Sequence, residues 1–268
     1  GMTALMMACN EGKKDVVKLL LDRSEGNIEL NTKEINGETA FIIACQEGHK
    51  DIVKLFLDPS VKNIDFNAIE QNGKTAFTLA CKNGFKDIVK LLLDNSSVGN
   101  IELNTKDNDG FTPFMMACQK GHKDVVNLLL NHSERIDLNA RPTDGWTAFM
   151  LACGNGHKDV VRLLPDHSDS IIDLNAKDDI LGRTAFMRSC YYGHKDIVQL
   201  LLDHSDPNID LNARADHNGW TAIIWACLYG HTDVVQLLLN KSDPNIDWNA
   251  KDDNGQTAFI WARQKRKK

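Results

Sequence analysis

Apolar and polar positions follow one two-part pattern that repeats along the chain. In residues 39–46, a threonine precedes apolar side chains that recur with helical spacing. In residues 50–57, a Lys-Asp pair precedes a stripe of β-branched residues and leucines. Each part predicts a short amphipathic helix, and Gly48 between them predicts the left-handed turn that ends the first helix.

The pattern returns at nearly constant distances. The glycine that precedes each threonine lies 35 to 37 residues from the next, and a period this regular is typical of a solenoid. These glycines are Gly1, Gly37, Gly73, Gly110, Gly145, Gly182, Gly219 and Gly255. They divide one predicted domain, residues 1–268, into approximate repeats at 1–36, 37–72, 73–109, 110–144, 145–181, 182–218, 219–254 and a partial one at 255–268.

Local signals support two helices per repeat. The threonine can cap the first helix through its hydroxyl, and the aspartate of Lys-Asp suits the positive end of the second helix dipole. An Asn-Gly or Asp-Gly pair between repeats predicts a hairpin turn. The aspartates at the helix start are therefore interpreted as structural rather than catalytic: Asp15, Asp51, Asp87, Asp124, Asp159, Asp196 and Asp233.

Each repeat resembles the ankyrin repeat, and the segment DGFTPFMMACQKGHKDVVNLLL at residues 109–130 matches the family's hairpin, short helix, tight turn and longer helix. The resemblance covers essentially the whole chain. It implies an all-α ankyrin-repeat solenoid of stacked helix-turn-helix units with short β-hairpin connections. The chain departs from the family's Thr-Pro-Leu-His motif, since the proline is kept only at Pro113 and the histidine is replaced in every repeat.

Composition and charge narrow the class of protein. The chain is 42% hydrophobic and 25% charged, as globular proteins are, and its formal charge of −6 argues against nonspecific nucleic-acid binding. No 18-residue apolar run or signal peptide is visible, so an intracellular, cytoplasmic protein without a membrane span is expected. The basic tail, residues 263–268, is interpreted either as a solvated helix end or as a nuclear-import or anion-binding segment.

Seven cysteines share one register. Adjacent helices pack about 8–10 Å apart, whereas a disulfide needs Cα atoms within about 7 Å. Free core thiols in a reducing compartment are therefore expected at Cys9, Cys45, Cys81, Cys118, Cys153, Cys190 and Cys227. Cys45 and His49 are spaced like metal ligands, but one thiol and one imidazole per repeat fall short of a structural zinc site. No metal or cofactor is expected.

No catalytic constellation stands out. A nucleophile, a base and an orienting group must converge in one pocket, whereas the reactive residues of this chain recur along a line. Neither of the glycine-rich phosphate-binding motifs, G-x-x-x-x-G-K-[ST] and G-x-G-x-x-G, occurs. The remaining histidines fall in polar loops and are expected to be solvated: His132, His167, His204 and His217. An enzyme is not expected.

The repeats differ most at the residue after the hairpin glycine and at the pair after the cysteine, positions that line the concave groove in the family. Tyrosine and tryptophan, which dominate binding hot spots, concentrate there in the second half of the chain. We hypothesise a ligand groove whose candidate residues are Phe111, Trp146, Arg183, Arg188, Tyr191, Tyr192, Trp220 and Tyr229. The alternative is that the tryptophans only shield neighbouring hairpins.

Arg188 breaks a framework rule, because the other repeats carry an apolar residue at its register. Either its guanidinium binds an acidic group of a partner, or its stem covers apolar surface while the charge reaches water. By contrast, four phenylalanines at a framework register are expected in the core: Phe77, Phe114, Phe149 and Phe186.

Together these features predict a non-catalytic, monomeric scaffold that binds a protein or an extended peptide. The partner is expected to be apolar or aromatic, with an acidic residue opposite Arg183 or Arg188. Two alternatives stay open: a structural spacer within a larger multidomain protein, or a weak nucleic-acid or other anionic contact through the basic tail. The second alternative would show a steep salt dependence.

Overall fold

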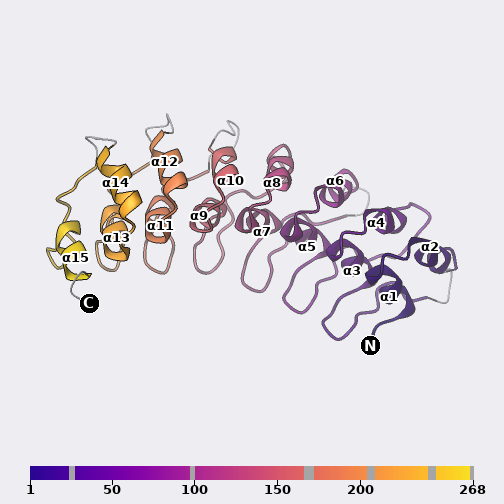
Figure 1. Cartoon of the computed structure of the whole chain (residues 1–268). Coiled ribbons are helices and arrows are strands. Elements are labelled where there is room, and N and C mark those ends of the chain that lie inside the picture. Colours follow the sequence, from indigo (N-terminus) through magenta and orange to yellow (C-terminus); the bar gives the residue numbers. More distant parts are fainter. Residues whose placement is uncertain (24–27, 97–99, 166–171, 204–208, 241–245, 266–268) are drawn as a thin grey trace. The chain divides into compact units, whose positions relative to one another are not determined.

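The computed structural model describes residues 1–23, 28–96, 100–165, 172–203, 209–240 and 246–265. These ranges hold fifteen α-helices and no β-strand (Figure 1). The chain divides into two compact units, Gly1–Asp137 and Leu138–Lys268, each described by itself. Whether they form the single domain expected from the sequence stays a prediction.

Both units repeat one helical pair. The first unit contains α1 (Ala4–Asn10), α2 (Lys14–Asp22), α3 (Ala40–Gln46), α4 (Lys50–Phe56), α5 (Ala76–Asn83), α6 (Lys86–Asp94), α7 (Pro113–Lys120) and α8 (Lys123–Leu130). The second contains α9 (Ala148–Gly154), α10 (Lys158–Leu163), α11 (Ala185–Tyr192), α12 (Lys195–Asp203), α13 (Ala222–Tyr229), α14 (Thr232–Asn240) and α15 (Ala258–Lys265).

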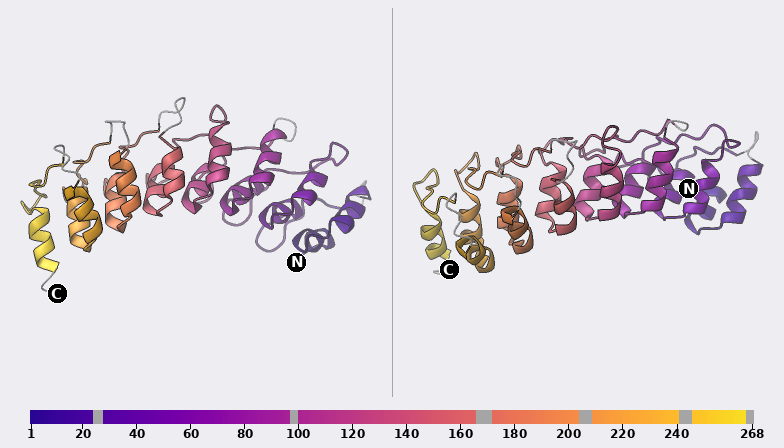
Figure 2. Two further views of the ribbon diagram at one scale, coloured as in Figure 1. Left: turned by 45° about the horizontal axis from the view of Figure 1, so that its top comes forward. Right: turned by 90° about the horizontal axis from the view of Figure 1, so that it is seen from above.

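The helices of each unit form two layers. Odd-numbered first helices pack side by side, and even-numbered second helices pack side by side behind them (Figure 2). Each first helix from α1 to α13 also packs on the second helix of its own repeat, as α11 does on α12. This arrangement confirms the predicted solenoid of stacked helix-turn-helix repeats. No helix in the described ranges is long and apolar enough to cross a membrane.

Threonine caps set the start of the first helices. In α11 the hydroxyl of Thr184 accepts a hydrogen bond from the amide of Met187 at 3.3 Å, which satisfies one of the free amides of the first turn. The same bond forms at Thr3, Thr39, Thr75, Thr112 and Thr147. Thr221 precedes α13 with the same extended backbone but makes no such bond. The second helices instead begin with the predicted aspartate in their first turn and, where a cap is described, have no side-chain cap.

A glycine with positive φ lies within two residues of the end of each first helix from α1 to α13, as predicted. Gly84 and Gly193 are left-handed C-caps with φ of 77° and 74°. A Cβ atom at Gly84 would lie 2.5 Å from Nδ1 of His122, so backbone conformation and close packing both require glycine there.

The hairpins are turns rather than strands in the described residues. In one of them, the amide of Glu70 donates to the carbonyl of Lys74 at 3.0 Å. The amide of Gln71 then donates to the carbonyl of Asn36 in the preceding hairpin at 2.7 Å. Neighbouring hairpins are thus joined side by side, which positions the residue after each hairpin glycine next to the following repeat.

The cysteines lie where the first-helix layer packs. All seven thiols are free, six of them buried and Cys227 half-buried, which confirms the expected core positions. Burial raises the pKa of Cys9 to about 12 and raises the pKa of Cys227 above its ordinary value. The framework phenylalanines Phe77, Phe114, Phe149 and Phe186 are likewise buried.

The histidines beside the second helices join adjacent repeats. Nε2 of His194 lies 2.9 Å from the carbonyl oxygen of Gly154 in the preceding repeat, and because a carbonyl only accepts, Nε2 donates. Equivalent bonds run from His49 to Asn10, from His122 to Lys82 and from His231 to Tyr191. The described residues contain no group of three or more histidine, cysteine, aspartate or glutamate residues that could hold a metal ion.

Candidate functional site

Six aromatic side chains of the second unit form one continuous cluster on its hairpins and first helices. We call this cluster the aromatic surface; it consists of Tyr191, Tyr192, Trp220, Trp225, Tyr229 and Trp261. Ring centroids are 4.5 Å apart between Tyr191 and Tyr229 and 4.6 Å apart between Trp220 and Trp225. Most of these pairs meet edge to face, the geometry that aromatic pairs prefer.

The aromatic surface has a buried floor and an exposed rim. Trp225 is only 4% exposed, whereas Tyr192 and Tyr229 are 45% and 42% exposed. Both exposed tyrosines lie in the last turn of their helices, α11 and α13, where the chain turns toward the second-helix layer. Large aromatic area is therefore exposed at the rim, where Tyr229 packs against the buried Trp225.

Two residues of the aromatic surface were not among the candidates derived from the sequence. Trp225 and Trp261 occupy the same framework register as Arg188 and were therefore interpreted as scaffold. Trp261 lies 5.0 Å from Trp220, and Trp225 lies 5.2 Å from Tyr191, centroid to centroid. The available signal was that a tryptophan replaces the usual leucine, isoleucine or methionine at this register in consecutive repeats.

Asp252 fixes two of the indoles. Its Oδ2 accepts a hydrogen bond from Nε1 of Trp220 at 3.1 Å and from Nε1 of Trp261 at 2.9 Å. Its Oδ1 accepts from the amides of Asn254 and Gln256, which closes the hairpin before α15. One hairpin carboxylate thus orients aromatic rings from two adjacent repeats.

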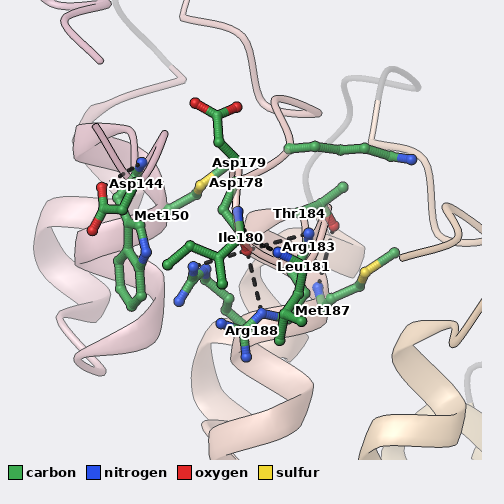
Figure 3. Close-up of polar contacts among 12 residues, drawn as sticks. Asp144, Met150, Asp178, Asp179, Ile180, Leu181, Arg183, Thr184, Met187 and Arg188 are labelled. Carbon is green, nitrogen blue, oxygen red and sulfur yellow. Dashed lines mark hydrogen bonds and ion pairs between the residues drawn. The ribbon is translucent and has the colours of Figure 1, made fainter. Parts of the chain in front are cut away.

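In the hairpin before α11, Asp178 is also a shared acceptor, but it binds two arginine side chains rather than two indoles. Its Oδ1 accepts from the amide of Leu181 at 2.7 Å, and its Oδ2 accepts from Nε of Arg183 at 3.2 Å and from Nη2 of Arg188 at 2.8 Å (Figure 3). Burial alone would raise the pKa of Asp178. The Leu181 amide and the charges of Arg188 and Arg183 outweigh burial, so the pKa lies below its ordinary value.

Arg188 differs from both sequence-based interpretations. Its side chain is 0% exposed, so the guanidinium does not reach water, and it faces Asp178 of its own chain rather than an open surface. The guanidinium carbon lies 3.1 Å from the centre of the Trp146 ring. Sequence reasoning could not find this arrangement, because it depends on Asp178 and Trp146 in two separate hairpins.

Arg183 joins this ion pair to the aromatic surface. Its guanidinium carbon lies 5.6 Å from the centre of the Tyr191 ring and 5.9 Å from that of Trp225, within range of cation–π attraction. The side chain is 11% exposed. Among the candidate residues, the structure therefore brings together Arg183, Tyr191, Tyr192, Trp220 and Tyr229. Arg188 adjoins Arg183 through Asp178, and Trp146 lies against Arg188.

Phe111 lies in the first unit, half-buried beside its own hairpin. Its amide donates to Oδ1 of Asp107 at 2.9 Å, and its carbonyl accepts from the Asp107 amide. A groove that extends from Phe111 to Tyr229 stays a prediction.

A cavity of about 830 Å³ lies at the end of the second unit, between α13, α14 and α15. It is lined mainly by apolar side chains, among them Val235, Leu239 and Phe259.

In the basic tail, Arg263 is exposed, while residues 266–268 lie outside the described ranges.

Comparison with known families agrees with the geometry. A family model described as ankyrin repeats (3 copies) matches residues 1–70, 60–142, 134–215 and 205–268. These matches follow one another along the entire chain. No curated protein matches the chain as a relative.

Proposed function

Since the chain belongs to the ankyrin-repeat family, we propose that it is a non-catalytic scaffold that binds a protein segment at the aromatic surface. Ankyrin repeats generally mediate protein–protein interaction, which supports the general part of this proposal. The free thiols agree with a reducing, intracellular location, which forms part of the same proposal.

The observation that carries the proposal is the exposed rim of the aromatic surface. Tyr192 and Tyr229 present large, rigid rings with a polar end and lose little side-chain entropy on binding. A role limited to shielding the hairpins would not require exposed rings at the ends of α11 and α13. A contiguous set of aromatic side chains on a monomeric protein is typical of an interaction site.

The chemistry of the surface defines the partner that we propose. An extended segment with apolar or aromatic side chains complements the rings, and an acidic residue complements Arg183. Affinity should come from a few central contacts rather than from the buried area as a whole.

The experiment is a comparative pull-down from cell lysate with quantitative mass spectrometry. The test variant carries Tyr192→Ser and Tyr229→Ser, changes at exposed positions that leave the buried floor intact. The matched control is Phe259→Ser, which removes an aromatic ring that is 76% exposed in the same unit but lies outside the aromatic surface. Circular dichroism checks that all three proteins fold.

We expect at least one protein to be captured by the native chain and by Phe259→Ser but not by the double variant. If the double variant captures the same proteins in the same amounts, the aromatic surface is not the binding site. The polar cavity of about 240 Å³ beside Glu38 and Lys74 in the first unit would then be the next surface to test.

A further inference from the structure

The cluster of Arg183, Arg188 and Asp178 at the start of α11 carries more positive than negative charge. Arg183 and Arg188 both contact Oδ2 of Asp178, so one carboxylate serves two guanidinium groups. All three side chains are largely withdrawn from water, with exposed fractions of 11%, 0% and 0% for Arg183, Arg188 and Asp178. An excess positive charge in such surroundings is costly unless an anion compensates it.

Two carboxylates, one in this hairpin and one in the next, pair with other basic side chains. Asp179 pairs with Arg141 at 2.9 Å, and Asp216 pairs with Lys177 at 2.6 Å. Neither Asp179 nor Asp216 therefore compensates the excess charge.

At two other boundaries between repeats, the residue at the register of Arg183 contacts a carboxylate of the next hairpin. At the same register, Lys74 pairs with the carboxylate of Asp107 in the next hairpin at 3.2 Å, and Trp220 donates to Asp252 in the next hairpin. For Arg183, the residue at the equivalent position of the next hairpin is Ala215. Its amide donates to the carbonyl of Trp220, just as the amide of Asp107 donates to the carbonyl of Phe111. Ala215 has no carboxylate, so the cation of this junction lacks the anion of the next repeat.

The guanidinium group of Arg188 has hydrogen-bond donors that remain unpaired among the residues that the structure describes. Its Nε and Nη1 atoms are buried and have no hydrogen-bond partner within the described part of the chain. Burial and the neighbouring charge of Arg183 lower the pKa of Arg188 to about 10, which still leaves it charged at neutral pH. Arg188 thus stays positively charged at neutral pH, and Asp178 accepts a hydrogen bond from only one of its three guanidinium nitrogens.

We propose that Arg183 binds a carboxylate side chain of the partner segment, and that Arg188 is a positioning residue that keeps Arg183 available by sharing Asp178. This inference rests on the proposed function of the aromatic surface. Because Asp178 neutralises one charge, the second is left to Arg183, the more exposed of the two arginines. The partner supplies the anion that Ala215 does not.

A carboxylate fits this site better than a phosphate. The excess is one positive charge, which matches one carboxylate, whereas a phosphate group brings about −1.5 to −2. The guanidinium of Arg183 lies against Tyr191 and Trp225, so a glutamate flanked by aromatic residues would contact the charge and the rings together.

The experiment measures preference for charge with defined peptides. Isothermal titration calorimetry compares Ac-Trp-Glu-Trp-NH₂ with its glutamine counterpart and with its phosphoserine counterpart, on the native chain. A charge-assisted hydrogen bond contributes about 1.5–3 kcal/mol, so we expect the glutamate peptide to bind at least about tenfold more tightly than the glutamine peptide.

Three variants separate the roles of the two arginines. Arg183→Met should abolish the preference for glutamate. Arg188→Met places the residue that two other repeats carry at this register, Met7 and Met116, and should also abolish the preference because Asp178 then neutralises Arg183. Arg188→Lys keeps the charge and should retain most of the preference, a rescue that a purely structural role of Arg188 would not produce.

The outcomes distinguish this inference from the proposed function. Equal binding of the glutamate and glutamine peptides, or no binding of the glutamate peptide at millimolar concentration, overturns the carboxylate site, while the pull-down still decides the role of the aromatic surface. Tighter binding of the phosphoserine peptide than of the glutamate peptide overturns the choice of carboxylate. An unchanged preference in Arg188→Met overturns the positioning role.

Discussion

At the scale of single residues, Arg188 is the clearest departure from the repeat. Its register is apolar in every other repeat, and a buried arginine in that place adds a charge that must be desolvated. Replacing a buried charged residue by an apolar one of similar volume is often neutral or stabilising, whereas removing the partner of a buried charge is strongly destabilising. The two members of this ion pair should therefore respond differently to substitution.

Arg188→Met is expected to leave the free energy of unfolding within about 1 kcal/mol of the native value or to raise it. Asp178→Asn is expected to lower it by about 3–5 kcal/mol, because two guanidinium groups then lack their carboxylate. Urea unfolding followed by circular dichroism measures both. Similar losses in the two variants would show that Arg188 stabilises the fold rather than the binding site.

The thiols provide a second residue-scale prediction. Burial raises the pKa of every cysteine, and a thiol reacts through its thiolate. In the native chain at neutral pH, iodoacetamide should modify Cys227 first, since it is the one half-buried cysteine, and the other six much more slowly. Mass spectrometry over time measures the order, with the urea-unfolded chain as control. Early modification of Cys118 would contradict its position in the core.

At the scale of secondary structure, the sequence was sufficient where each element carries its own boundary signals. The threonine before a first helix and the glycine after it act within one or two turns of the chain, so the periodicity predicted both helices of each repeat. Asp178 and Arg188 could not be paired in this way, because the register of Arg188 predicts an apolar environment and the hairpin brings in the carboxylate from ten residues earlier. Trp225 and Trp261 were missed for the same reason: their register indicates core, while their contacts within the aromatic surface depend on how the helices stack.

The threonine caps give an element-scale prediction with a control in the same unit. Thr184→Ala removes the hydrogen bond to the Met187 amide and should lower the free energy of unfolding by about 0.5–2 kcal/mol. Thr221→Ala removes a buried hydroxyl that makes no cap bond, so its effect should be smaller. Denaturant unfolding of the two variants measures the difference, and equal losses would contradict the capping role.

At the scale of the whole molecule, the stacking of repeats determines how many neighbouring helices lose stability when one residue is substituted. Stability in such an array is approximately a sum of repeat and nearest-neighbour contributions. For Asp178→Asn, hydrogen exchange should therefore increase most in α11 and in the helices that pack on it, α9, α12 and α13. Exchange mass spectrometry that instead found equal increases in α1 and α3 would indicate that the chain unfolds as one cooperative body.

The histidine bonds between adjacent repeats bear on how such a chain can change its length over evolutionary time. Each bond joins a side chain of one repeat to a backbone carbonyl of the one before, and the acceptor residue is an asparagine, a lysine, a glycine or a tyrosine. Because the acceptor is backbone, its side chain is free to differ. A duplication or deletion of one whole period would therefore rebuild the same junction between residues that had never been neighbours, so the array can gain or lose repeats while its variable surface diversifies independently.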